Sequence, residues 1–256
     1  MSKILYKIFH STEVLERTSY VEAATNTLNR IGEPLDTPTI IINSPETLKK
    51  FLSEEPYFAK NLNLKGYDPR EHGKKNNPAL KSTNIRIGWK YGEIGVWASN
   101  YMAWKKFLAS DADYLILAED DVIFNVRAVY LFNTYIKELP EDWDQFHFWP
   151  PPEDNSSYLE AEHGISKAYV CKTYQDWSNA CYILTKNGAK KLIESLETQS
   201  IHLPLDWHWF KIGYKYGLNS YTIKPDADPI CRVSTVLPST FQYDMRRTDL
   251  TGFPPI

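Results

Sequence analysis

Cysteine is scarce in this 256-residue sequence, and the three cysteines present do not form a recognisable pair. Cys171, Cys181 and Cys231 are odd in number, and no two of them make a Cys-x-x-Cys unit. Disulfide frameworks use even numbers of cysteines, and structural zinc sites use closely spaced ones. The sequence therefore argues against both kinds of scaffold and indicates reduced thiols, as in the cytoplasm.

Long apolar runs and a large net charge are also absent. The apolar stretch at residues 4–9 is interrupted by Lys7 and lacks the hydrophobic region and cleavage site of a secretory signal. Nothing approaches the roughly 18 apolar residues needed to cross a bilayer. A formal charge of −3 gives no general attraction to nucleic acid or anionic lipid. We expect a cytoplasmic protein without a membrane span, for which a nucleic-acid partner is disfavoured and the oligomeric state is open.

The sequence does contain a regular alternation of strand-like and helix-like segments. Residues 3–9 form an apolar strand, residues 13–30 a helix, residues 38–43 a β-branched strand and residues 44–53 a helix that begins with Pro45. This order is typical of an α/β fold with a central, mostly parallel sheet flanked by helices. The length fits a single domain over residues 1–256.

Two segments lack this periodicity. Residues 54–84 are rich in Lys, Asn, Pro and Gly and predict a mobile loop near the site. Residues 224–256 are rich in proline and predict a C-terminal segment that wraps the surface. Between them, the pattern predicts helices at 92–110, 126–137, 186–196 and 205–216, and strands at 113–118, 144–149 and 180–184.

The strand at residues 113–118 runs directly into three consecutive acids, Glu119-Asp120-Asp121. Ligands of open α/β sheets bind at the carboxyl ends of strands. Adjacent carboxylates repel one another unless a cation or a set of donors neutralises them, and Mg²⁺ or Mn²⁺ is a suitable cation for oxygen ligands. Such an ion can stabilise a departing diphosphate. The plain alternative is a solvated loop in which an Asp caps the next helix.

Three motifs in order along the chain resemble glycosyltransferase family 25. Gly92-Glu93-Ile94-Gly95 and the strand ending in Glu119-Asp120-Asp121 resemble the family's Gly-Glu-x-Gly-Cys helix start and its strand ending in Glu-Asp-Asp. The segment at residues 179–192 resembles the family's strand-turn-helix, and Pro204-Leu205-Asp206 its Pro-Val-Asp. The sequence departs from the family pattern at two of these positions, where Val96 replaces the family's Cys and Asn100 replaces its His.

The resemblance implies a GT-A-like single domain that binds a nucleotide-diphospho-sugar, most simply a UDP-sugar, through Mn²⁺ or Mg²⁺. It implies that the acidic triplet acts as a DxD-like motif. Asp121 would ligate the ion, and Glu119 would face the ribose or the ion's water shell, with Asp120 in the same donor site.

Further residues of the donor site follow from the same resemblance. Phe9 and His10 end the first strand, where GT-A folds place the nucleotide base, and Glu93 belongs to the family's helix-start motif. His208 is a candidate late metal ligand, in competition with His202, Asp226 and Asp228 and with a purely structural role.

The family inverts configuration at the sugar, which requires a base for the acceptor hydroxyl. Asp206 is the candidate, because it begins an aromatic segment where apolar surroundings can raise the pKa of a carboxyl. A helix N-cap is the alternative role for Asp206.

The acceptor most in keeping with the resemblance is a saccharide hydroxyl, as in glycan biosynthesis. A hydroxymethylated DNA base and a hydroxylysine in protein are alternative acceptors. A glycoside hydrolase with paired acids, and a carbohydrate-binding protein without activity, are the other readings.

Overall fold

The computed structural model describes residues 2–11, 14–64, 89–149, 168–173, 180–205, 208 and 217–234. Its centre is a seven-stranded sheet of order β2-β1-β3-β7-β5-β8-β6. The strands are β1 (Ile4–Phe9), β2 (Glu33–Pro34), β3 (Tyr114–Glu119), β5 (Gln145–His147), β6 (Val170–Lys172), β7 (Cys181–Thr185) and β8 (Ser220–Ile223). Within this sheet, β7 and β6 run antiparallel to the strands beside them. The other five strands share one direction, which confirms the predicted α/β class with a mostly parallel sheet.

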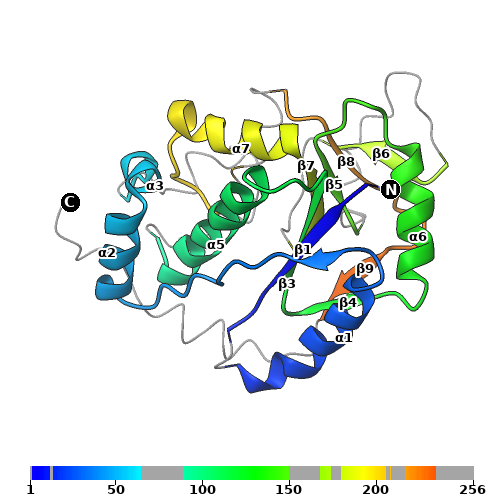
Figure 1. Ribbon diagram of the computed structural model, residues 1–256, viewed down its shortest axis with the longest axis horizontal. Helices are drawn as coiled ribbons and strands as arrows, with labels where there is room; N and C mark the ends of the chain where they lie inside the picture. The colour runs from blue at the N-terminus through cyan, green and yellow to red at the C-terminus, as the bar shows by residue number, and fades with distance from the viewer. Residues whose placement is uncertain are drawn as a thin grey trace, which may run out of the picture.

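Helices cover both faces of this sheet (Figure 1). On one face lie α5 (Tyr91–Leu108) and α7 (Lys186–Gln199), with α2 (Pro45–Glu54) and α3 (Pro56–Asn61) beside them. On the other lie α1 (Thr18–Leu28), which follows the 3-10 turn η1 (Leu15–Arg17), and α6 (Ala128–Tyr135), which continues into η3 (Ile136–Glu138). A two-stranded pair, β4 (Val122–Phe124) with β9 (Cys231–Val233), lies next to α1. Within the described part of the chain, no helix has the length and apolarity to cross a membrane.

Strand β3 shows why the sheet is buried on both sides. Leu115 and Leu117 point toward α5 and α7, and Ile116 and Ala118 point toward α1 and α6. All four are at most 1% exposed. Successive strand residues face opposite sides, so a strand that is apolar at every position must be covered twice. The continuous apolar run before the acidic triplet therefore dictates a sheet between two helical layers.

Helix α5 covers much of the first face, and its Gly95 lies close to the backbone of the segment at residues 38–43. A Cβ on Gly95 would lie 3.2 Å from the carbonyl oxygen of Ile40, so the glycine allows this close approach. The backbone N–H of Ile40 donates to Ser99 Oγ at 2.9 Å instead of to a strand. The predicted strand at residues 38–43 is therefore wrong: the segment forms no strand, Ile42 is buried beside α5, and the strands that pair with β1 are β2 and β3.

Two segments predicted to be irregular contain regular structure. Helix α3 lies within residues 54–84, because Pro56 fits a first helical position and Phe58 is fully buried between Phe51 and Tyr101. Residues 65–84 of the predicted loop lie outside the described residues. The proline-rich C-terminal segment contributes β9, and its remaining residues, 235–256, also lie outside the described part.

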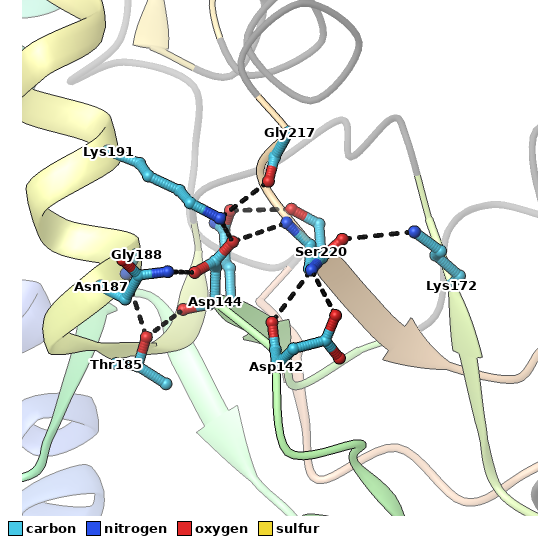
Figure 2. A network of polar contacts seen from close by, with 11 residues as sticks. Asp142, Asp144, Lys172, Thr185, Asn187, Gly188, Lys191, Gly217 and Ser220 are labelled. Carbon is cyan, nitrogen blue, oxygen red and sulfur yellow. Dashed lines mark hydrogen bonds and ion pairs between the residues drawn. The ribbon is translucent and has the colours of Figure 1, made fainter.

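A buried carboxylate ties the second half of the sheet to α7 (Figure 2). The side chain of Asp144, before β5, is 0% exposed and accepts from Asn187 Nδ2 at 2.7 Å, Lys191 Nζ at 2.5 Å and the Asn219 backbone N–H at 2.8 Å. Its carbonyl accepts the Thr185 N–H at 3.0 Å. A Cβ on Gly188 would lie 2.3 Å from that carbonyl oxygen, so only glycine fits there. One residue thus links β5, β7, α7 and the start of β8.

We expect Asp144→Asn to lower the free energy of unfolding by about 3 kcal/mol, because it leaves the partly buried charge of Lys191 without its partner. Urea unfolding followed by circular dichroism measures this. Glu194→Gln is the matched control, since it breaks the exposed Lys190–Glu194 pair and should change stability little. Equal losses in the two variants would show that the Asp144 network does not hold the sheet to α7.

Candidate active site

The carboxyl ends of β1 and β3 form the centre of the candidate site. The two strands are parallel neighbours in a register that places Phe9 opposite Glu119. The next residue of each strand continues this pairing, since His10 Nδ1 lies 2.9 Å from Asp120 Oδ2. The backbone N–H of His10 donates to Thr39 Oγ1 at 3.2 Å, which fixes the end of β1. The structure thus brings together Phe9, His10 and the acidic turn, defined here as Glu119, Asp120 and Asp121.

An arginine that sequence analysis did not single out completes this arrangement. Arg17, the last residue of η1, donates from Nη1 to Asp120 Oδ1 and lies 3.7 Å from Asp121 Oδ2. Its side chain is 14% exposed, so the charge is largely removed from water. Both carboxylate oxygens of Asp120 are therefore occupied, one by Arg17 and one by His10.

Asp121 is in a different situation from Asp120. Its Oδ1 atom is buried and has no hydrogen-bond partner among the described residues. Its carbonyl accepts the Ser234 N–H at 2.8 Å, so β9 holds the turn from the far side. Burial raises the pKa of the Asp121 carboxyl, Arg17 opposes that rise and the charge of Asp120 adds to it. A buried carboxylate with an open oxygen is available to a cation or a donor group supplied by a ligand.

Glu119 points to the α5 side of the sheet, as the alternation along β3 requires. Its charge contributes, after burial, to raising the pKa of Tyr182 on β7. The Tyr182 hydroxyl donates to Asn100 Oδ1 at 2.5 Å and accepts from Trp104 Nε1 at 3.2 Å. Asn100, where the family has His, is therefore part of a buried polar group beside Glu119.

Other predicted site residues make contacts elsewhere. Glu93 accepts the Lys90 N–H at 2.9 Å, which satisfies a backbone donor at the start of α5. His208 is fully buried, with its ring 4.8 Å from Trp97 and 6.4 Å from His202. Asp228 pairs with Arg127 at the surface. Asp206 lies outside the described residues.

The described residues fit a divalent ion in one respect. The free oxygen of Asp121 suits a hard cation, whereas both oxygens of Asp120 already have partners, one of them the Arg17 cation. No group of three His, Cys, Asp or Glu side chains suited to a metal occurs among the described residues. The arrangement therefore suits an ion held by few protein ligands that takes others from phosphate, as Mg²⁺ commonly does.

We expect Asp121→Asn to leave the protein as stable as the original or more stable, because it removes a buried charge with an unpartnered oxygen. The raised pKa means that the cost of this charge is complete above that pKa and is relieved as pH falls through it. The stability difference between the two proteins should therefore shrink in acid. Thermal unfolding over a pH series measures it, and a clear loss of stability at neutral pH would contradict this account of Asp121.

Comparison with known proteins places the chain in a family. The family model described as "Glycosyltransferase family 25 (LPS biosynthesis protein)" matches residues 60–209. A glycosyltransferase 25 family member from Aedes aegypti is 27% identical over 145 residues, which are 54% of this chain and 22% of that protein. The chain therefore matches only about a fifth of that relative's length.

A solved structure with lower sequence identity also resembles this chain. It is a mutant of Drosophila beta-1,4-galactosyltransferase 7 in complex with manganese, UDP-Gal and xylobiose, with a TM-score of 0.47 and 10% identity. The similarity covers 98% of this chain and 78% of that one. The family match spans more than half of the chain and includes α5, the acidic turn, β7 and α7. The chain belongs to glycosyltransferase family 25.

Proposed function

We propose that this chain is an inverting, metal-dependent glycosyltransferase that moves a sugar from a UDP-sugar to a hydroxyl on a saccharide. Family membership supports sugar transfer. The observation that carries the donor side is the buried Asp121 carboxylate with a free oxygen at the carboxyl end of β3. Open α/β sheets bind their ligands at this edge.

The donor lies, in this proposal, across the ends of β1 and β3. Phe9 is half-buried at the edge and offers an apolar ring to the nucleotide base, with His10 next to it. Glu119 is at the same level on the neighbouring strand and is assigned to the ribose or to the water shell of the ion. Asp121 provides the direct carboxylate ligand, and Asp120 holds the turn through His10 and Arg17. A bound Mn²⁺ or Mg²⁺ would supply the Lewis acidity that stabilises the departing diphosphate.

The acceptor hydroxyl needs a base, and Asp206 is assigned this role. The support comes from the Pro204-Leu205-Asp206 motif and from the burial of the residues on both sides of it. Leu205 and His208 are buried, and the preceding Leu203 carbonyl accepts from Trp97 Nε1 of α5 at 2.8 Å. The chain next to Asp206 is thus anchored to the helix that carries the family's first motif.

Residues 1–256 are proposed to act as one catalytic domain. The described strands of the central sheet come from residues as far apart as Ile4 and Ile223. Separating the N-terminal and C-terminal halves would leave β3 without β1 or without β7. The donor site, which needs β1, β3 and β9 together, would be lost in either piece.

We expect turnover of a UDP-sugar to require Mn²⁺ or Mg²⁺ and to be lost with EDTA. Asp121→Asn should lower kcat/KM by on the order of 10² to 10³, as loss of a group that stabilises developing charge does. Release of UDP, measured across UDP-, GDP- and CMP-sugars with and without Mn²⁺, tests both expectations. Asp111→Asn, in an exposed pair with Lys3, is the control and should keep full activity.

The same assay contains the outcomes that count against the proposal. Turnover that survives EDTA would show that the reaction does not depend on a metal ion. If no nucleotide sugar gives turnover or a thermal shift, the enzyme proposal fails and a carbohydrate-binding protein without activity becomes the better interpretation. A panel with saccharides, hydroxylysine peptides and hydroxymethylated DNA identifies the acceptor.

We expect Asp206→Asn to lower kcat for transfer by about 10² to 10⁴, the usual contribution of a general base. The KM for the donor should change little, because the base acts on the acceptor. Rates of transfer at varied donor concentration measure both constants, with Asp142→Asn, an exposed aspartate beside Asn219, as the control. Unchanged turnover in Asp206→Asn would assign the base elsewhere.

A further inference from the structure

We propose that Arg17 is a resident counter-cation of the acidic turn, which keeps the affinity for a divalent ion low until a nucleotide diphosphate is bound. This inference rests on the proposed function, since it concerns how that same donor site fills. It assigns Arg17 a positioning and charge-balancing role that acts through Asp120 and Asp121.

The geometry gives Arg17 contact with two acids at once. Its Nη1 donates to Asp120 Oδ1 and is 3.7 Å from Asp121 Oδ2. All three side chains are largely buried, with exposed fractions of 14% for Arg17, 11% for Asp120 and 13% for Asp121. Charges in such surroundings interact more strongly than they do in water. The guanidinium therefore offsets much of the negative potential that would draw a divalent cation to Asp121.

The occupied oxygens of Asp120 lead to the same conclusion. With Arg17 on one oxygen and His10 Nδ1 at 2.9 Å from the other, both Asp120 oxygens already have a partner, and a cation bound there would lie close to the positive charge of Arg17. The oxygen that remains open is Oδ1 of Asp121. One carboxylate beside a fixed positive charge is a weak site for a bare divalent ion, whereas a diphosphate adds both negative charge and oxygen ligands.

A purely structural role for Arg17 would have the opposite consequence. If Arg17 only ties η1 to the turn after β3, removing it loosens Asp120 and Asp121, and Mn²⁺ binding without nucleotide weakens or stays the same. If Arg17 balances charge, removing it makes the turn more negative, and Mn²⁺ binding strengthens. The sign of the change in affinity separates the two roles.

The experiment measures Mn²⁺ binding to the full chain by electron paramagnetic resonance of free Mn²⁺, with and without UDP. In Arg17→Gln we expect the affinity for Mn²⁺ alone to rise at least about tenfold, because one unit charge a few ångströms from a divalent ion implies that much even in bulk water. The enhancement by UDP should shrink correspondingly. Arg17→Lys keeps the charge and should behave as the original protein does. Lys105→Gln is the matched control, since it removes from α5 the exposed cation that pairs with Glu55 and should leave Mn²⁺ binding unchanged.

A double variant protects the test against a local loss of structure. Arg17→Gln combined with Asp120→Asn removes one charge of each sign, so the affinity for Mn²⁺ alone should return close to that of the original protein. Unchanged or weaker Mn²⁺ binding in a folded Arg17→Gln variant, alongside normal binding of Mn²⁺ with UDP by the original protein, would overturn this inference and leave the proposed function standing. If the original protein binds no Mn²⁺ even with UDP, the proposed function itself fails.

Discussion

The parallel pairing of β1 with β3 is the constraint on which the candidate site depends. Because Phe9 stands opposite Glu119, the residues that follow each strand meet in space although they are 110 positions apart in the chain. The hydrogen bond between His10 and Asp120 is a direct result of this register. A shift of one residue would turn the side chains of β3 to the opposite faces and place Leu117 against α1 instead of α5. The buried apolar core on both sides of β3 therefore fixes the position of the acidic turn.

The main elements of the fold could be predicted because their signals are local. The apolar run before Glu119, the helix at α5 and the strand-helix unit of β7 and α7 each have a pattern within a few residues. The strands that sequence analysis missed are only two to four residues long, and β8 also carries polar side chains. In β8, Ser220 and Thr222 are buried against Gln145, His147 and Cys171 on neighbouring strands, so nothing in the local sequence marks them as core. The segment around Ile40 shows the opposite error. Its β-branched apolar run predicts a strand, but the Ile40 N–H donates to the side chain of Ser99 on α5 instead of to a neighbouring strand.

The candidate site could be predicted only in part for a similar reason. The acidic triplet and the ends of β1 are visible in sequence, because strand ends and charge runs are local features. How the three acids divide their roles is not local. Arg17 reaches Asp120 across 103 positions, and nothing in the predicted helix at residues 13–30 marks it as a partner of the acids. The resemblance assigned the ion to Asp121 and the ribose or the water shell to Glu119. The structure adds how each acid is bonded: Asp120 has a partner on both oxygens, Asp121 has a buried oxygen without one, and the charge of Glu119 acts on Tyr182.

The different surroundings of the three acids explain why the acidic turn is stable without a bound ligand. Three adjacent acids that were all buried and ionised would repel one another strongly. Here Asp120 is paired with an arginine and a histidine, and Glu119 lies on the opposite side of the strand. Asp121 lies 3.7 Å from Arg17 through Oδ2, and its buried Oδ1 has no hydrogen-bond partner among the described residues. Folding supplies enough positive charge to hold the turn in place, and it leaves one carboxylate unsatisfied. The open oxygen of Asp121 is best matched by a ligand that brings a cation together with its own anionic groups. A metal-bound nucleotide diphosphate has both, whereas the metal ion alone or the nucleotide alone has only one of them.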